Sequence, residues 1–196
     1  MKLEPITAVI LAGGRARRMG EVDKGLEMLR GRSLVEWVLE RIEPQVDDVF
    51  INANRNLDRY LEYGYPVISD RIPDYAGPLA GLHAALTEVA AGLVLTVPCD
   101  APFVPADLVQ RLRQALQEHD AQIAVASTAE RVHPVFSLCR SDVLTALAEY
   151  LNEGGRKVEA WHATLRCASV VFTDEDAFRN LNTLEELEAV ARTLER

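Results

Sequence analysis

The sequence contains no long hydrophobic run. No stretch of its 196 residues approaches the roughly 18 uninterrupted apolar residues that a membrane-spanning helix needs. The first five residues, Met1 to Pro5, also lack the apolar segment of a secretory signal peptide. We therefore expect a protein of the cytoplasm that neither spans nor binds a membrane.

Cysteine is scarce as well. The three cysteines, Cys99, Cys139 and Cys167, are odd in number and form no CxxC pair. A disulfide framework is not expected from this pattern, and reduced thiols fit a cytosolic protein.

Positive charge is in the minority. Lysine and arginine total 21 against 30 aspartates and glutamates, so the net charge is -9. An acidic balance disfavours general affinity for nucleic acid or anionic membrane.

Apolar residues make up 48% of the chain, and no repeat or proline-rich linker interrupts it. We expect one domain over residues 1–196.

Short apolar runs alternate with longer segments of helical spacing. Strands are expected at 7–12, 49–52, 67–70, 93–97, 123–126, 135–138 and 169–172. Helices are expected from Ser33 to Pro44, over 79–90, from Pro105 to Leu116, over 142–151, and from Thr183 onward. Ser33 with Glu36, and Thr183 with Glu186, form capping boxes. The alternation predicts an α/β fold in three layers, with a mostly parallel sheet covered on both faces.

In open sheets of this kind, ligands bind beyond the carboxyl ends of the strands. The first predicted strand is followed by the glycine-rich, basic segment 13–20 and then by Asp23, Lys24 and Gly25. Glycines let backbone N–H groups approach an anion, while arginine and lysine supply positive charge. Neither a Walker A loop nor a GxGxxG motif is present. The segment predicts phosphate binding by another kind of loop; a basic, solvated turn is the alternative.

Two carboxylates follow other predicted strands. Asp100 comes just after the strand 93–97, and Asp70 ends the strand 67–70. A carboxylate in such a place can hold Mg²⁺ together with substrate phosphates. The alternative is that Asp100 opens a proline-flanked turn and Asp70 caps one. Cys99 is not expected to be a nucleophile, because no histidine is paired with it.

Three further segments could contact a ligand. Asn52 and Asn54 lie at the end of the second strand, and amides can bind a base or a ribose. The segment 77–81 leads into a helix whose first N–H groups could face an anion. His133 and Pro134 could also contact a ligand, although a place in a hairpin is the simpler interpretation.

The segment from Leu11 to Leu26 resembles the signature of the molybdenum cofactor guanylyltransferases, which are Rossmann-like nucleotidyltransferases. The resemblance extends over nearly the whole chain. It continues through Asn52 to Arg55, Asp70, Gly77 to Gly81, Pro98 to Pro102, His133-Pro134 and Asn180 to Thr183. One departure is Leu184, where the family often has proline after the threonine.

The resemblance implies that the protein transfers GMP from GTP to molybdopterin and releases pyrophosphate. The positions that match the GTP-binding residues of the family are Leu11, Ala12, Gly13, Lys24, Asn52, Asp70 and Asp100. By the same resemblance, Lys24 contacts the phosphates and Asp100 binds Mg²⁺. We expect Arg18 and Lys24 to stabilise the leaving pyrophosphate, because charge accumulates there.

Some questions stay open at this level. A related enzyme that uses CTP, a sugar-1-phosphate nucleotidyltransferase, and a non-catalytic nucleotide-binding or chaperone module are alternatives. Partners beyond the two substrates could include other cofactor-biosynthesis proteins or recipient molybdoenzymes. Candidates for the molybdopterin pocket are Arg156, Lys157, Asn180 and Asn182, since an anionic pterin needs donors. Solvated loop positions are the alternative for all four.

Overall fold

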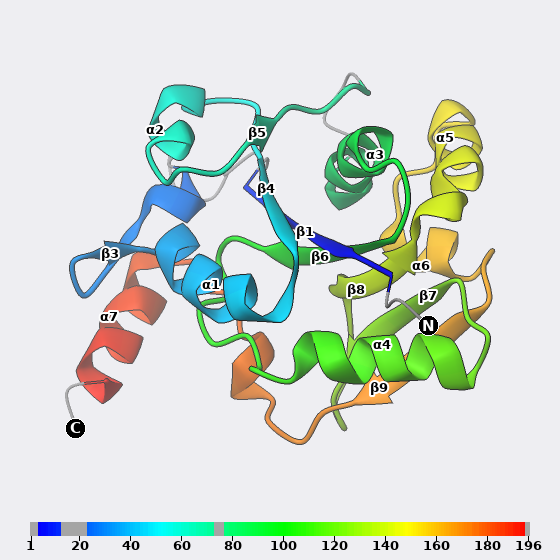
Figure 1. Ribbon diagram of the computed structural model, residues 1–196. Helices are drawn as coiled ribbons and strands as arrows, with labels where there is room; N and C mark the ends of the chain where they lie inside the picture. The colour runs from blue at the N-terminus through cyan, green and yellow to red at the C-terminus, as the bar shows by residue number, and fades with distance from the viewer. Residues whose placement is uncertain (1–3, 13–22, 73–76, 195–196) are drawn as a thin grey trace.

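A mainly apolar run forms β1 (Ile6–Leu11), an internal strand of the sheet. The computed structural model describes residues 4–12, 23–72 and 77–194. Within them, seven strands form one sheet in the order β5-β4-β1-β6-β8-β7-β9 (Figure 1). The other strands are β4 (Asp48–Asn52), β5 (Val67–Ile68), β6 (Leu93–Pro98), β7 (Ile123–Ser127), β8 (Val132–Arg140) and β9 (Cys167–Val171). Only β8 runs antiparallel to its neighbours, β6 and β7, so the sheet is mostly parallel as predicted.

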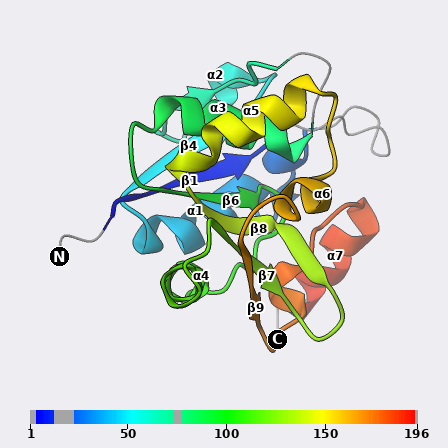
Figure 2. The same cartoon turned by 90° about the vertical axis from the view of Figure 1, so that its right-hand side faces the viewer.

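Helices cover both faces of the sheet. One face carries α1 (Leu34–Ile42) and α4 (Leu108–Glu118), and the other carries α3 (Pro78–Glu88), α5 (Leu144–Asn152) and α6 (Val158–His162) (Figures 1 and 2). Successive residues of a strand point to opposite faces. Accordingly, Ile10 of β1 packs into the core on the α1 and α4 side, whereas Val9 packs into the core under α3 and α5. The predicted three-layer arrangement is confirmed.

Both predicted capping boxes are present at the N-termini of their helices. The carboxylate of Glu36 accepts from the backbone N–H of Ser33 at 2.7 Å, and α1 begins one residue after Ser33. At the last helix, α7 (Leu184–Thr193), the N–H of Glu186 donates to Oγ1 of Thr183 at 3.2 Å. Leu184 in place of proline therefore leaves the start of α7 intact.

One predicted helix start is wrong. The third predicted helix starts at Pro105, but the corresponding α4 begins at Leu108 with Asp107 as its N-cap. Pro105 lies in a turn before it, and its carbonyl accepts from the N–H of Leu108 at 3.2 Å. Strand ends also shift, since β5 stops at Ile68, two residues before Asp70.

Several short elements are not predicted by the sequence pattern. They are α2 (Leu57–Leu61), the hairpin of β2 (Met28–Leu29) and β3 (Arg32–Ser33), and the 3-10 turns η1 (Lys24–Leu26), η2 (Glu43–Gln45), η3 (Ser141–Val143) and η4 (Asp176–Phe178). The hairpin turns through Arg30 and Gly31, both with positive φ. A two-residue hairpin turn of this kind usually contains Asn-Gly or Asp-Gly, so the dipeptide Arg-Gly does not predict it. In the described part of the chain, no helix is long and apolar enough to cross a membrane.

Candidate active site

The carboxyl ends of three parallel strands meet at one edge of the sheet. Leu11 at the end of β1 is in register with Asn52 of β4 on one side and with Pro98 of β6 on the other. Backbone hydrogen bonds continue past the strands: the N–H of Ala12 donates to Asn52 at 2.8 Å, and that of Cys99 donates to Leu11 at 3.1 Å. The sheet therefore brings three of the predicted site segments side by side.

A cluster of amides surrounds Asp70. Its carboxylate accepts from Nδ2 of Asn52 at 2.9 Å and from Nδ2 of Asn54 at 2.8 Å. Its backbone N–H donates back to Oδ1 of Asn54 at 2.9 Å. Asn52 is buried, whereas Asp70 is half-exposed. The amide groups therefore fix the carboxylate and leave it accessible to a ligand.

The first turn of α3 packs directly against this cluster. Gly77, with φ of +73°, precedes the helix, and Pro78 occupies its first position, as the segment 77–81 predicted. A Cβ placed on Gly81 would lie 2.4 Å from Oδ1 of Asn52 and 2.5 Å from Cδ2 of Leu11. Only glycine allows this approach.

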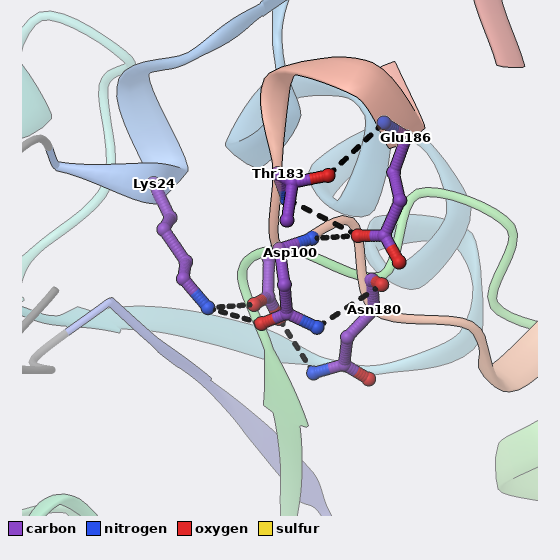
Figure 3. Close-up of polar contacts among 6 residues, drawn as sticks. Lys24, Asp100, Asn180, Thr183 and Glu186 are labelled. Atoms are coloured by element: carbon purple, nitrogen blue, oxygen red, sulfur yellow. Dashed lines mark hydrogen bonds and ion pairs between the residues drawn. The ribbon is translucent and has the colours of Figure 1, made fainter. Parts of the chain in front are cut away.

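A second polar cluster is centred on Asp100 (Figure 3). Nζ of Lys24 lies 3.1 Å from Oδ2 of Asp100, and Nδ2 of Asn180 donates to Oδ1 at 2.8 Å. Lys24 also donates to the side-chain oxygen of Asn182. The side chain of Asp100 is 8% exposed and that of Lys24 is 28% exposed. A buried carboxylate is thus neutralised by a cation that still reaches solvent.

The C-terminal segment is anchored to this cluster by its backbone. The N–H of Leu181 donates to the carbonyl of Asp100 at 2.8 Å. The carboxylate of Glu186 accepts from the N–H groups of Asn182, at 2.6 Å, and Thr183, at 3.1 Å (Figure 3). The capping box of α7 therefore also holds Asn182 beside Lys24.

A cleft of about 700 Å³ opens beside Asn180 and Asn182. Its lining comes from the end of β6, the loop before β8, the first half of β8, the η4 region and the start of α7: Pro98, Glu130, Arg131, Val132, His133, Pro134, Val135, Phe136, Glu175, Asp176, Arg179, Asn180, Asn182 and Glu186. Two arginines line it together with four acidic side chains, and Nε of Arg131 lies 3.4 Å from a carboxylate oxygen of Glu175. Because β8 runs antiparallel to β6, its first half lies beside the end of β6, where Asp100 follows.

His133 is buried in the wall of this cleft. It lies on β8, the second strand of the β7–β8 hairpin, and its ring stacks on Phe178 with centroids 4.6 Å apart. Burial lowers the pKa of His133, against the opposing effect of Glu175. A neutral imidazole at this place is part of the wall and supplies little positive charge.

Comparison with known proteins shows the family of this chain. A family model described as the MobA-like NTP transferase domain matches residues 8–166. This chain belongs to that family. A molybdenum cofactor guanylyltransferase from Cupriavidus metallidurans is 48% identical over 189 residues, covering 94% of this chain and 93% of the relative. One from Bordetella pertussis is 51% identical over 186 residues, covering 93% and 94%.

Solved structures share the fold at low sequence identity. The molybdopterin-guanine dinucleotide biosynthesis protein A of Archaeoglobus fulgidus superposes with a TM-score of 0.79 at 23% identity, over 96% of this chain and 98% of that protein. A 4-diphosphocytidyl-2C-methyl-D-erythritol synthase from Anaerococcus prevotii gives 0.76 at 14% identity, over 98% and 97%. The MobA-like fold thus carries more than one activity, and likeness of structure alone does not choose between them.

Most residues predicted for the site of this MobA-like NTP transferase lie at the same sheet edge. Lys24 and Asp100 are in direct contact, and Asn52 contacts Asp70. The two pairs are distinct, because β5 and β6, which precede the two aspartates, are separated by β4 and β1. Three strand spacings of about 4.8 Å place those strands about 14 Å apart. Predicted residues Gly13 and Arg18 lie outside the described residues.

Two other candidates, Arg156 and Lys157, lie in the loop that follows α5. Arg156 donates to the carbonyls of Leu151, at 2.9 Å, and Gly155, at 2.7 Å, at the end of α5. The carbonyl of Lys157 accepts from the hydroxyl of Tyr150 at 3.0 Å. The structure therefore ties Asn180 and Asn182 to the Asp100 cluster, and Arg156 to its own loop.

Cys99 precedes Asp100 but is not available for chemistry. Burial raises the pKa of the Cys99 thiol well above its usual value, and the neighbouring Asp100 and Asp23 act in the same direction. A thiol that stays protonated is a poor nucleophile. Cys99, Cys139 and Cys167 are all free of disulfides, as expected.

Proposed function

We propose that this protein transfers GMP from GTP to the terminal phosphate of molybdopterin, forming molybdopterin guanine dinucleotide and releasing pyrophosphate. The observation that carries the proposal is the near-full-length identity of about half to relatives named molybdenum cofactor guanylyltransferase. The contact of Lys24 with Asp100 at the end of β6 supports it, because nucleotidyl transfer needs positive charge and a carboxylate beside the phosphates.

We place the nucleotide across the strand ends, with its base at Asp70 and its phosphates at Lys24. The separation of about 14 Å between strands β5 and β6 suits a ligand that extends from base to phosphates. Guanine presents two adjacent donors, N1–H and the 2-amino group, which a carboxylate accepts as a pair. Cytosine presents one donor beside an acceptor. Asp70 therefore favours GTP over CTP.

We propose that Asp100 holds Mg²⁺ together with GTP. Its carboxylate is an oxygen ligand of the kind that Mg²⁺ prefers, and one or two carboxylates are enough when phosphates and water complete the shell. No group of three His, Cys, Asp or Glu side chains in the described residues could hold a metal alone. This fits an ion that arrives with its nucleotide. Bound Mg²⁺ would neutralise charge on the phosphates.

The chain must mainly bring two anions together. An oxygen of the acceptor phosphate forms a bond to the α-phosphorus of GTP, and the bond from that phosphorus to the β-phosphate oxygen breaks. Pyrophosphate leaves with the electron pair. The acceptor is already anionic, so no strong general base is required, and positioning dominates. We propose that Lys24 and Arg18 stabilise the negative charge on the leaving pyrophosphate.

The cleft beside Asn180 and Asn182 is the proposed place of the acceptor. It adjoins the Lys24 cluster through these two amides, and Arg179 lines it together with Arg131, which is paired with Glu175. Arginines and amides are suitable donors to an anionic pterin. An acceptor held there would have its phosphate near Lys24.

We further propose that residues 1–196 form a single nucleotidyltransferase domain. Lys24 from the start of the chain and Asn182 from its end complete one site, which supports this division. The product is a cofactor for other enzymes. Recipient molybdoenzymes and other cofactor-biosynthesis proteins in the cytoplasm are therefore its proposed partners.

Nucleotide preference tests the function. The purified protein is incubated with molybdopterin, Mg²⁺ and either GTP or CTP, and pyrophosphate release and dinucleotide formation are measured. We expect turnover with GTP and little with CTP. A preference for CTP would reverse the base assignment, and nucleotide binding without pyrophosphate release would indicate a non-catalytic module.

A further inference from the structure

Helix α2 contributes one buried side chain to the protein. This five-residue helix lies between β4 and β5, and Tyr60 is its only buried residue. Leu57 and Leu61 on the same helix are exposed. Tyr60 reaches inward to Asp23, the residue before Lys24. The Tyr60 hydroxyl therefore connects the buried side of α2 to the active site.

The carboxylate of Asp23 is buried and takes its donors from the α2 region. The Tyr60 hydroxyl donates to Oδ1 at 2.5 Å, and Nδ2 of Asn56 donates to Oδ2 at 2.9 Å. Nε of Arg55 lies 3.8 Å from the same oxygen. A buried carboxylate is costly unless donors surround it, so these contacts fix its position. Burial also raises the pKa of Tyr60, which keeps the hydroxyl protonated as a donor.

The turn that carries Lys24 is held on both sides. Asp23 is the N-cap of η1, and its carbonyl accepts from the N–H of Leu26 at 3.0 Å. A Cβ placed on Gly25 would lie 2.5 Å from the Tyr60 oxygen and 3.3 Å from Sγ of Cys99. Tyr60 therefore contacts the residues before and after Lys24, and the turn packs between Tyr60 and the residue that precedes Asp100.

The position of the Lys24 amine depends on this turn. Lysine has a flexible side chain, and that of Lys24 is partly exposed. Its contacts with Asp100 and Asn182 require its backbone to stay in place. A displacement of about 1 Å in a catalytic group can cost on the order of 100-fold in rate.

We propose that Tyr60 is a positioning residue for Lys24. By donating to Asp23, its hydroxyl holds the turn from which Lys24 reaches Asp100 and the phosphates of GTP. That Lys24 contacts the phosphates of GTP rests on the proposed function above. Tyr60 acts through the turn and does not touch the substrate.

The substitution Tyr60→Phe removes the hydroxyl and keeps the ring. We expect kcat for pyrophosphate release to fall about 10- to 100-fold, with KM for GTP changing less than about threefold, because the ground-state contacts at Asp70 remain. Tyr63→Phe is the matched control. It removes a hydroxyl that donates to Ser33 at 2.9 Å, in the same region but away from Asp23. Its kcat should stay within about twofold of the wild type.

Testing Tyr60→Phe in a second variant, Lys24→Ala, distinguishes a positioning role from a general loss of structure. If Tyr60 acts through Lys24, then Tyr60→Phe should cause almost no further loss in a Lys24→Ala protein, since coupled residues are not additive. The same fold-loss in both backgrounds would overturn the proposal, and so would a wild-type kcat for Tyr60→Phe. Should Tyr60→Phe be unfolded at the assay temperature, Asp23→Asn is tested in both backgrounds against the same criteria.

The outcomes also distinguish this inference from the proposed function. A wild-type protein that releases no pyrophosphate from GTP and molybdopterin contradicts the function, whatever Tyr60 does. An active wild type and an impaired Lys24→Ala, together with a Tyr60→Phe that matches Tyr63→Phe, contradict only the inference.

Discussion

At the scale of single residues, Asp100 combines burial with charge. Among the residues that the structure describes, each of its carboxylate oxygens has one partner, Lys24 on Oδ2 and Asn180 on Oδ1. A carboxylate oxygen can accept more than one interaction, so both oxygens can still bind a cation or its water shell. The proposed role of Asp100 in holding Mg²⁺ therefore depends on the negative charge of its carboxylate.

The substitution Asp100→Asn removes that charge at nearly constant shape. We expect kcat to fall by about 100-fold or more at saturating Mg²⁺, because the metal and the phosphates lose their anionic partner. The measurement is pyrophosphate release over a Mg²⁺ titration. Asp120→Asn serves as the control: Asp120 is an exposed aspartate, and its ion pair with Arg166 at 3.6 Å should contribute little. Near-normal turnover of Asp100→Asn would reject the metal role.

At the scale of elements, the position of α3 depends on the absence of a side chain at Gly81. Alanine in place of a helical glycine normally stabilises by about 0.5–1 kcal/mol. At this position the added Cβ would meet Asn52 and Leu11 at 2.4–2.5 Å. Overpacking of this kind costs about 1–3 kcal/mol, so the contact outweighs the helical gain.

Gly81→Ala should therefore disturb the base end of the site. Moving Asn52 removes a donor from Asp70, and we expect KM for GTP to rise about 10-fold with a smaller change in kcat. Steady-state kinetics at varied GTP measures both. Thr87→Ala, on the exposed side of the same helix, is the control and should leave KM unchanged. An unchanged KM in Gly81→Ala would show that Asn52 does not position Asp70 for the base.

The elements that the sequence predicts are those with a strong local pattern. The apolar runs of β1 and β6 and the capping boxes of α1 and α7 are all found. Helix α2 was missed because its single buried side chain gives no periodicity. The start of α4 was misplaced because a proline can precede a first turn as well as open it.

The site could be predicted only where a motif spans it. Lys24 and Asp100 come from motifs that resemble the family, and the structure brings them together. The pairing of Asp23 with Tyr60 could not be predicted. It joins residues 37 positions apart, and only the folded chain shows which tyrosine reaches the carboxylate.

At the scale of the whole molecule, an acidic protein must handle anionic substrates. Its net charge of -9 gives no general attraction for GTP or for an anionic pterin. Under the proposed function, binding therefore depends on cations placed locally, such as Lys24 at the strand ends and Arg179 in the cleft. This arrangement favours specific ligands over nucleic acid, which needs an extended basic surface.

Global stability should also depend on pH through a buried histidine. His162 ends α6, and Nε2 of its buried ring has no hydrogen-bond partner in the described structure. Burial lowers its pKa to about 4, with Glu159 opposing the shift. In the unfolded chain a histidine titrates near pH 6.5. Above this value the ring is neutral in both states and its contribution is fully present. As the pH falls from about 6.5 to 4, only the unfolded state takes up the proton, so stability is lost.

The substitution His162→Leu should therefore flatten the acid dependence of the melting temperature. We expect Tm of the wild type to fall more steeply than that of His162→Leu between pH 6.5 and 4.5, measured by circular dichroism. His119→Leu is the matched control, since His119 is exposed. It should keep the wild-type slope. The slope of His162→Leu should be reduced but not abolished, because burial also lowers the pKa of His133. Parallel curves for the wild type and His162→Leu would mean that folded His162 takes up its proton over the same pH range as in the unfolded chain, and is therefore solvated or paired.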